Sequence, residues 1–373
     1  MELKAMPQIQ IMIVDDSLVV RKVLTNVLTA DPDLAIAGWA SNGRLALAKL
    51  QTLRPDIILL DIEMPEMNGL ETIPGIRKLL PHTPIIMFST LTERGAEATL
   101  DALALGASDY VAKPSNQNMA ATTEAINRDL VPKIKGLCHF PARGQNTVAG
   151  VAIPAIPTKR TEIRFHAAPL RIAHPKIVTI GVSTGGPDAL ARLLPAFPAN
   201  FPLPVVIAQH MPAIFTLLLA RRLATKCAMP VRECQPGDLL GPSSVWLAPG
   251  DFHMIVQQDE NRVRLATHQG PRENFCRPSV DVLFRSVAAV YGANALGVIL
   301  TGMGQDGLKG CEALCAAGAS VIVQDEGSSV VWGMPGFVAR AGLAEKILPL
   351  DQIGNEIIRR VTSQPSLQLT HWS

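Results

Sequence analysis

The chain alternates short apolar runs with amphipathic segments of helical length, and this alternation limits the folds open to it. In the first third, five apolar runs have the length of strands: Gln10–Val14, Leu34–Gly38, Ile57–Leu60, Ile85–Ser89 and Tyr110–Ala112. Helix-like segments follow them at 18–30, 43–53, 69–80, 93–105 and about 116–131. Strands that alternate with helices predict an open parallel sheet with helices on both faces. We therefore predict an α/β protein whose first domain is a (βα)₅ unit.

Composition narrows the class further. Hydrophobic residues make up 48% of the chain and charged residues 18%, which excludes a disordered protein. Aromatic residues are only 4%, as expected for aliphatic cores between parallel strands and helices. No apolar run approaches a membrane span, and the first residues do not resemble a signal peptide. The six cysteines form no C-x-x-C pair, so we expect a reducing cytoplasm.

Charge and proline content divide the chain into three parts. Residues 1–131 carry a net charge of −5, residues 132–176 a net charge of +7, and residues 177–373 a net charge of zero. The middle part also has six prolines and no sustained periodicity, which is typical of a linker. Its basic residues are thinly spaced, which favours a solvated tether over a nucleic-acid-binding arm. We predict two folded domains, 1–131 and 177–373, joined by a basic linker at 132–176.

Acidic residues collect at the strand ends of the first domain. Asp15 and Asp16 follow the first strand, and Asp61 closes the third. Because the carboxyl ends of parallel strands share one edge of a sheet, these carboxylates should lie together and repel one another unless a cation is present. Hard oxygen ligands suit Mg²⁺. Ser89 and Lys113, which end the fourth and fifth strands, provide a hydroxyl and an ammonium suited to an added phosphoryl group.

The second domain begins with a strand that runs into a candidate nucleophile. Ile177–Val182 is followed by Ser183, and residues 181–185 match G-x-S-x-G, in which a tight turn from strand to helix exposes the serine hydroxyl. A phosphate-binding loop is the alternative interpretation, but the segment contains neither G-K-[ST] nor G-x-G-x-x-G. The motif alone is a weak signal, so a base and an acceptor that orients it must be found elsewhere.

Two further strand ends supply such groups. His210 follows the strand Pro204–Ala208, and Asp306 follows the strand Ala295–Thr301, so both should share a sheet edge with the serine. His253, beside Asp251 in the loop PGDFH, is the competing histidine. We favour His210 because it adjoins its strand, whereas His253 is expected on a longer loop. A zinc site of His210, His253 and Asp306 is the weaker alternative, because no pair of ligands has metal-binding spacing.

Residues 9–131 resemble a response-regulator receiver domain of flavodoxin-like fold, through the motifs VDDS, LLDIEMPEMNGL and VAKP. The resemblance implies four roles for these residues. Asp61 would be the phosphoacceptor, and Mg²⁺ would be held by Asp15, Asp16, Asp61 and the backbone carbonyl of Glu63. The phosphoryl group would be bound by Ser89 and Lys113. The Lys113–Pro114 bond would be cis. Thr90, after Ser89, departs from the small residue common in the family.

Residues 177–350 resemble the catalytic domain of the chemotaxis methylesterase (CheB) family, through GVSTGGP, IAQHMP, WLAPGDFH, RPSVDVLF, TGMGQDGL and VVWGMPG. The resemblance implies a Rossmann-like, doubly wound α/β domain whose hydrolase site needs no cofactor. It assigns Ser183 as nucleophile, His210 as base and Asp306 as the partner of the base. It places the backbone N–H of Met303 in the oxyanion site, beside the nucleophile's neighbour Thr184.

Together the two resemblances imply a phosphorylation-regulated enzyme of bacterial chemotaxis. It would hydrolyse glutamyl methyl esters on methyl-accepting chemoreceptors and deamidate receptor glutamines. Its phosphodonor would be a chemotaxis histidine kinase, and the cytoplasmic protein would be recruited to membrane-bound receptor clusters without being embedded in the membrane. A DNA-binding output domain is the first alternative, but the second domain is electrically neutral and has no helix-turn-helix motif. A catalytically silent scaffold is the second alternative, but it would not need Ser, His and Asp on one sheet edge.

Overall fold

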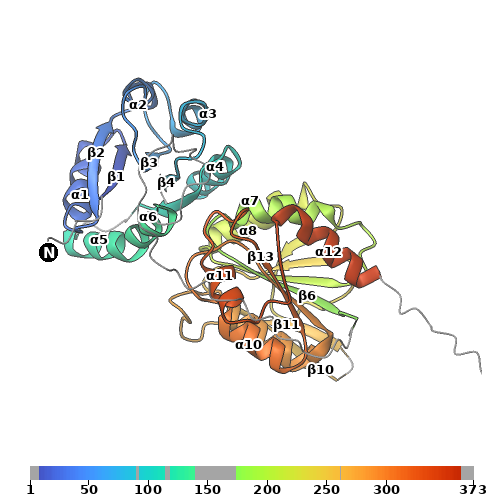
Figure 1. Ribbon diagram of the computed structural model, residues 1–373. Coiled ribbons are helices and arrows are strands. Elements are labelled where there is room, and N and C mark those ends of the chain that lie inside the picture. Colours follow the sequence, from blue (N-terminus) through green and yellow to red (C-terminus); the bar gives the residue numbers. More distant parts are fainter. Residues whose placement is uncertain (1–7, 90–91, 114–117, 139–173, 261, 363–373) are drawn as a thin grey trace, which may run out of the picture. The chain divides into compact units, whose positions relative to one another are not determined.

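The computed structural model describes residues 8–89, 92–113, 118–138, 174–260 and 262–362. The described chain forms two compact units, the first from the sequence before residue 139 and the second from the sequence after residue 173 (Figure 1). Each unit is an α/β structure built on a parallel sheet, which confirms the predicted fold class. No helix among the described residues combines the length and apolarity needed to span a membrane.

The first unit is a five-stranded parallel sheet with the strand order β2-β1-β3-β4-β5. Strands and helices alternate along the chain: β1 (Ile9–Val14), α1 (Leu18–Leu28), β2 (Leu34–Ala40), α2 (Gly43–Leu50), β3 (Ile57–Asp61), α3 (Gly69–Leu79), β4 (Ile85–Ser89), α4 (Glu93–Ala104) and β5 (Asp109–Ala112). The three middle strands are almost completely buried and aliphatic. Burial of apolar residues on both faces of these strands is what fixes the parallel sheet.

The end of the first unit differs from the prediction. Instead of one helix at 116–131, the chain forms α5 (Met119–Ala125), a π-helical turn η1 (Ile126–Leu130) and α6 (Val131–Cys138). In α6, Ile134 and Leu137 are buried, and Lys133 pairs with the carboxylate of Asp109 at 2.9 Å. Pro132, which has no N–H to donate, follows the π-helical turn within this continuous helical run. Helical structure that packs on the first unit therefore continues past residue 131 to Cys138, and the residues 139–173 of the expected linker lie outside the described residues.

The second unit is a seven-stranded parallel sheet with the order β14-β13-β12-β6-β7-β9-β8, beside an antiparallel hairpin of β10 and β11. Its elements are β6 (Ile177–Val182), α7 (Gly186–Leu193), η2 (Leu194–Ala196), β7 (Pro204–Gln209), α8 (Ala213–Ala224), β8 (Val231–Glu233), β9 (Ser244–Leu247), β10 (His253–Asp259), β11 (Arg262–His268), α9 (Val280–Tyr291), η3 (Gly292–Asn294), β12 (Ala295–Ile299), α10 (Leu308–Ala316), β13 (Ser320–Gln324), α11 (Met334–Arg340), β14 (Lys346–Leu348) and α12 (Leu350–Thr362).

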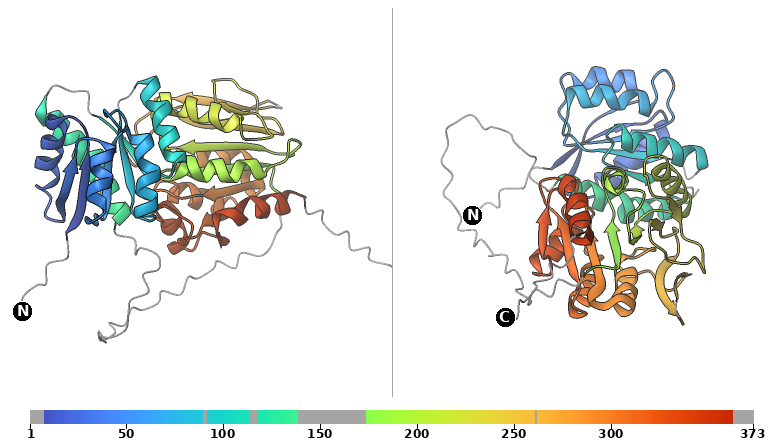
Figure 2. Two further views of the ribbon diagram at one scale, coloured as in Figure 1. Left: turned by 90° about the horizontal axis from the view of Figure 1, so that it is seen from above. Right: turned by 90° about the vertical axis from the view of Figure 1, so that its right-hand side faces the viewer.

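The order of these strands creates a switch point at β6. From β6 the chain runs outward through β7 towards β9 and β8, and later returns to place β12 on the other side of β6. Helices α7 and α12 pack together, and α9 and α10 pack together, so that helices cover both faces of the sheet (Figures 1 and 2). Open α/β sheets bind ligands beyond the carboxyl ends of the strands at such a point. The ends of β12, β6 and β7 are therefore where a site is expected.

Candidate functional site

The first unit gathers three carboxylates at one edge of its sheet. Asp15 and Asp16 follow β1 and Asp61 ends β3, and one oxygen of each lies within 4.8 Å of the others. The ammonium of Lys113 contacts Asp15 at 3.0 Å and Asp61 at 2.7 Å. The structure thus brings together four of the residues that the sequence predicts for this site.

Burial and charge set the ionisation of this cluster. Burial raises the pKa of Asp61 to about 6, with the hydrogen bond and charge of Lys113 acting in the opposite direction and Asp15 adding to the rise. Burial lowers the pKa of Lys113, but its bonds to Asp61 and Asp15 outweigh this and raise it overall. Asp61 is therefore mainly ionised at neutral pH. Three clustered carboxylates, two of which pair with the ammonium of Lys113, fit a hard divalent cation such as Mg²⁺.

The other predicted residues of this site lie around the cluster. The hydroxyl of Ser89 accepts from Thr99 at 2.9 Å and donates to the carbonyl of Gly95 at 3.3 Å, so it is bonded to α4. Glu63 lies two residues after Asp61, and its side chain is exposed. Thr90 and Pro114, and with Pro114 the predicted cis bond, lie outside the described residues.

In the second unit, Ser183 follows β6 at the turn into α7. Its N–H donates to the carbonyl of Thr301 at 3.0 Å, which ties the turn to the end of β12. Gly185, at φ 77°, lies in the left-handed region that favours glycine, and it caps α7. Gly302 lies so close that a Cβ on it would be 2.8 Å from that of Ser183. The turn is therefore the predicted strand–turn–helix, and glycines provide the room for it.

The other predicted residues of the oxyanion region lie on either side of Ser183. Thr184 is buried, and its carbonyl accepts from the hydroxyl of Thr301 at 3.0 Å. Met303 is half-buried in the loop after β12, between Gly302 and Gly304. Both residues thus belong to the two loops that follow β6 and β12, at the switch point of the sheet.

His210 and Asp306 meet, as the sequence predicts. Nε2 of His210, just past β7, lies 2.7 Å from Oδ2 of Asp306, in the loop after β12. Both side chains are largely buried. The pair therefore joins two strand ends on opposite sides of β6. Among the described residues, no hydrogen bond joins the Ser183 hydroxyl to His210.

The carboxylate of Asp306 is held by a dense set of donors. Besides His210, it accepts hydrogen bonds from Val280 N at 2.7 Å, Ser279 Oγ at 2.8 Å, Asn274 Nδ2 at 3.0 Å, Asp281 N at 3.1 Å and Gly307 N at 3.1 Å. Burial alone would raise the pKa of Asp306, but His210 and these donors hold it well below its usual range. Asp306 therefore stays ionised and can orient and stabilise a protonated imidazole.

The second nitrogen of His210 faces a cysteine. Nδ1 lies 3.5 Å from Sγ of Cys276, which precedes the cis bond Arg277–Pro278. Burial lowers the pKa of His210, but the electrostatic interactions and hydrogen bonds of the imidazole with Cys276 and Asp306 outweigh burial and raise the pKa to about 10. An imidazole with this pKa is mostly protonated at neutral pH, so only its unprotonated fraction can act as a base. Because Nε2 is held by Asp306, that fraction accepts a proton from a nucleophile on Nδ1. Cys276 therefore influences the pH range in which this nitrogen is free.

Replacement of Cys276 by alanine is expected to move the acid limb of the pH–rate profile to lower pH. A base works only when unprotonated, so activity rises as pH passes through its pKa. Without the thiol, the pKa of His210 falls and the active form appears at lower pH. The profile of kcat/KM on a small soluble ester measures this shift, with Cys311→Ala, a buried cysteine on α10, as control. An unchanged limb, or one displaced to higher pH, would contradict the prediction.

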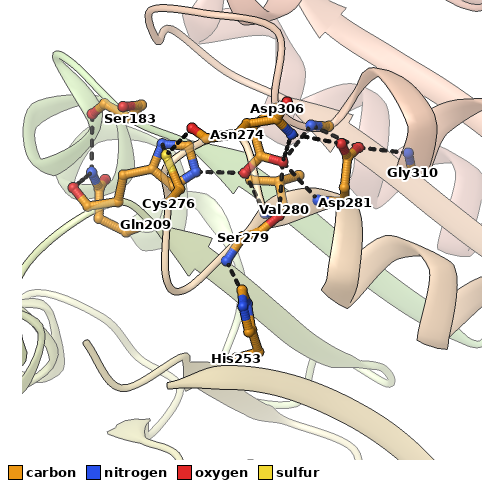
Figure 3. Close-up of polar contacts among 12 residues, drawn as sticks. Ser183, Gln209, His253, Asn274, Cys276, Ser279, Val280, Asp281, Asp306 and Gly310 are labelled. Carbon is orange, nitrogen blue, oxygen red and sulfur yellow. Dashed lines mark hydrogen bonds and ion pairs between the residues drawn. The ribbon is translucent and has the colours of Figure 1, made fainter. Parts of the chain in front are cut away.

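His253 has a structural environment instead. It is buried at the first residue of β10, not on a longer loop as the sequence suggested, because the hairpin with β11 begins there. Its Nε2 lies 2.9 Å from the carbonyl of Pro271, and its Nδ1 accepts from Ser279 N at 3.2 Å (Figure 3). Burial lowers its pKa. Since both ring nitrogens have these partners, a zinc site that includes His253 has no support among the described residues.

Several residues of this site were not predicted from the sequence. Asn274, Cys276, Ser279 and Asp281 all come from the segment before and at the start of α9. Asn274 donates to both Asp306 and Asp281, and Asp281 accepts from the N–H groups that begin α10. Two of these residues, Ser279 and Asp281, lie in the motif RPSVDVLF. A serine and an aspartate at the start of an apolar helix usually indicate helix capping, so they did not point to the site.

Fold and geometry together define a class: a two-unit α/β protein in which a receiver-like acidic site accompanies a site of the serine-hydrolase type. Residues 178–357 match the family model for CheB methylesterase, and residues 11–124 match that for the response regulator receiver domain. The chain belongs to the CheB methylesterase family.

Two curated relatives support this assignment and match along nearly the whole chain, and one solved structure is similar to the second unit. The protein-glutamate methylesterase/protein-glutamine glutaminase of Trichodesmium erythraeum is 48% identical over 95% of this chain and 100% of its own length. The protein of the same name from Nocardioides is 48% identical over 97% of this chain and 98% of its own length. The crystal structure of the Thermotoga maritima CheB methylesterase catalytic domain is 40% identical, covering 50% of this chain and 98% of its own, with a TM-score of 0.49.

Proposed function

We propose that this protein is a phosphorylation-regulated protein-glutamate methylesterase and protein-glutamine glutaminase of chemotaxis, with Ser183, His210 and Asp306 as its catalytic residues. The observation that carries the site assignment is the convergence of three adjacent strand ends, with His210 and Asp306 joined at 2.7 Å. The names of relatives that match along the whole chain supply the substrate class.

The chemistry follows from these positions. Ser183 Oγ attacks the side-chain carbonyl of a glutamyl methyl ester, and Nδ1 of His210 takes the proton of the serine hydroxyl. His210 returns that proton to the leaving methanol, and Asp306 stabilises the imidazolium in between. Water then cleaves the acyl-enzyme by the same route and leaves a carboxylate. With a glutamine side chain the leaving group is ammonia, so one site serves both reactions.

The negative oxygen of the tetrahedral intermediate needs fixed donors. We assign the backbone N–H of Met303 to this role, with Thr184 supporting the turn beside it. The closeness of Gly302, the chain neighbour of Met303, to Ser183 supports this assignment, because the missing side chain lets the loop after β12 approach the nucleophile. A donor of this kind typically contributes about 10²–10³-fold in rate.

Regulation is assigned to the first unit. Asp61 accepts the phosphoryl group from a chemotaxis histidine kinase, while Asp15, Asp16, Asp61 and the carbonyl of Glu63 hold Mg²⁺. The ion, when bound, neutralises charge on the phosphoryl oxygens. Lys113 pairs with the new charge, and Ser89 exchanges its bonds to α4 for one to the phosphoryl group. The phosphorylation signal thereby reaches α4.

Localisation and domain limits follow from the same proposal. The substrates are methyl-accepting chemoreceptors, and the protein works in the cytoplasm, recruited to receptor clusters, without nucleic acid as a partner. We assign residues up to 138 to the receiver, a linker to the residues between 138 and 177, and 177–373 to the catalytic domain.

The proposed activity is tested by methanol release from methylated receptor membranes, with and without a small-molecule phosphodonor. Hydrolysis that the phosphodonor increases is the expected result. A DNA-binding regulator or a silent scaffold would release no methanol under either condition, and either outcome would overturn the proposal.

Replacement of Asp61 by asparagine is expected to abolish the increase caused by the phosphodonor. Asparagine keeps the shape but cannot form the acyl phosphate, so the coupling, typically about 5–150-fold, is lost. Asp56→Asn, just before the opposite end of β3, is the matched control and should keep the response. The ratio of methanol release with and without phosphodonor measures the effect. A response that survives in Asp61→Asn would place the phosphoacceptor elsewhere.

A further inference from the structure

A strained turn lies beside the candidate active site. Glu273 and Cys276 exchange two backbone hydrogen bonds of 3.2 and 2.8 Å, which close a four-residue turn. Its central residues, Asn274 and Phe275, have φ of 50° and 63°. Two consecutive positive φ values define a type I′ turn, in which Asn followed by Gly is preferred. Asn274 suits its position, whereas a phenylalanine at the glycine position is strained.

The side chains of this turn have different directions. Asn274 contacts Asp306 and Asp281, and Cys276 contacts His210 (Figure 3). Phe275, between them in the chain, is 89% exposed, more than any other large hydrophobic residue among those described. The turn therefore holds the proposed base and its partner with two side chains and presents an aromatic ring to solvent with the third.

Folding does not account for this phenylalanine. Its ring buries almost no surface, so it gains little from the hydrophobic effect. Its backbone conformation would be relieved by glycine. A residue that costs strain and adds no packing indicates a binding role, and an exposed aromatic ring is suited to contact a protein partner.

The turn is also fixed in place. Glu273 pairs with Arg285 of α9 at 2.6 Å, and Arg277 pairs with Asp251 at 2.6 Å in the loop before β10. With Asn274 bonded to two buried carboxylates, the turn is anchored on each side of Phe275. A ring held in this way loses little conformational freedom when it binds.

We propose that Phe275 is a substrate-docking residue, which contacts an apolar side chain of the receptor beside the esterified glutamate. The inference rests on the proposed function and adds to it a determinant of specificity. Hydrolysis of a protein side-chain ester requires a surface that recognises the protein around the ester. The two chain neighbours of Phe275 contact the proposed catalytic residues: Asn274 bonds to Asp306, and Cys276 contacts His210. Phe275 therefore lies beside the catalytic groups, where such recognition is needed.

The test compares two substrates in the full-length protein. In Phe275→Gly, we expect the ratio of kcat/KM on methylated receptor membranes to kcat/KM on a small soluble ester to fall about 10-fold, mostly through KM. The thermal midpoint should rise by about 2–4 °C as strain is relieved. Phe275→Tyr, which keeps an aromatic ring, should keep the ratio at the wild-type value. Leu239→Ser, another exposed apolar residue of the second unit, is the control and should leave the ratio unchanged.

The alternative outcomes are distinct. Equal losses on both substrates would overturn the proposal and make the turn a support of the catalytic groups only. An unchanged ratio would show that Phe275 has no docking role. A gain on the small ester in the unphosphorylated protein would assign Phe275 to contact with the receiver instead. Absence of receptor hydrolysis in the wild-type protein would overturn the proposed function itself, independently of Phe275.

Discussion

Replacement of Ser183 by alanine is expected to abolish hydrolysis of receptor methyl esters, with a loss of about 10⁴–10⁶-fold in kcat. The hydroxyl is the only group that the proposed route uses to form the acyl-enzyme, and alanine removes it without adding volume. The residue follows a fully buried strand, and its backbone bond to Thr301 is kept in the variant. Methanol release from methylated membranes measures the loss, and circular dichroism and the thermal midpoint verify the fold.

The matched control for this loss is Ser244→Ala. Ser244 begins β9 in the same sheet, and its hydroxyl donates to the carbonyl of Gly241 and accepts from the indole N–H of Trp246. Its removal should cost about 1 kcal/mol of stability for each lost bond and leave hydrolysis intact. Turnover of folded Ser183→Ala protein above a few per cent of the wild-type value would show that another group is the nucleophile.

The fold could be predicted from sequence to a large extent because its signals are local. Short aliphatic runs such as Ile57–Leu60 are buried on both faces, and this alone favours a parallel sheet. The exception is α6, where Ile134 and Leu137 bury one helix face within a segment that charge and proline content assign to a linker. The linker was predicted from the net charge of residues 132–176 as a whole, and the apolar periodicity of α6 extends over only about two helical turns of that segment.

The candidate site was predictable where it depends on strand ends. His210 and Asp306 lie 96 residues apart in sequence, yet the rule that parallel strands end at one edge predicts their meeting. Asn274 and Cys276 were not predictable, because their turn has Asn-Phe where the usual sequence signal of such a turn is Asn-Gly. Its course is fixed by long-range contacts such as that of Arg277 with Asp251, which no local pattern encodes.

Replacement of the two histidines is expected to separate their roles by an equally large difference in kcat. His210→Ala should cost about as much as Ser183→Ala, because residues that act as a unit are lost together, and the double variant should be scarcely worse than either. His253→Ala should act on stability instead. Removal of its ring leaves the carbonyl of Pro271 and the N–H of Ser279 without these partners, at a cost of about 1–3 kcal/mol.

Two measurements on each variant separate these effects. Thermal midpoints should fall for His253→Ala, whereas kcat on a small ester, corrected for the folded fraction, should collapse only for His210→Ala. His253→Gln retains a donor and an acceptor, so it should recover part of the stability lost in His253→Ala. The physical basis is the difference in partners: His210 has one nitrogen held by an ionised carboxylate and one that faces only the thiol of Cys276 at 3.5 Å, whereas both nitrogens of His253 are engaged by backbone groups. If folded His253→Ala lost as much kcat as His210→Ala, the base would have been assigned to the wrong strand end.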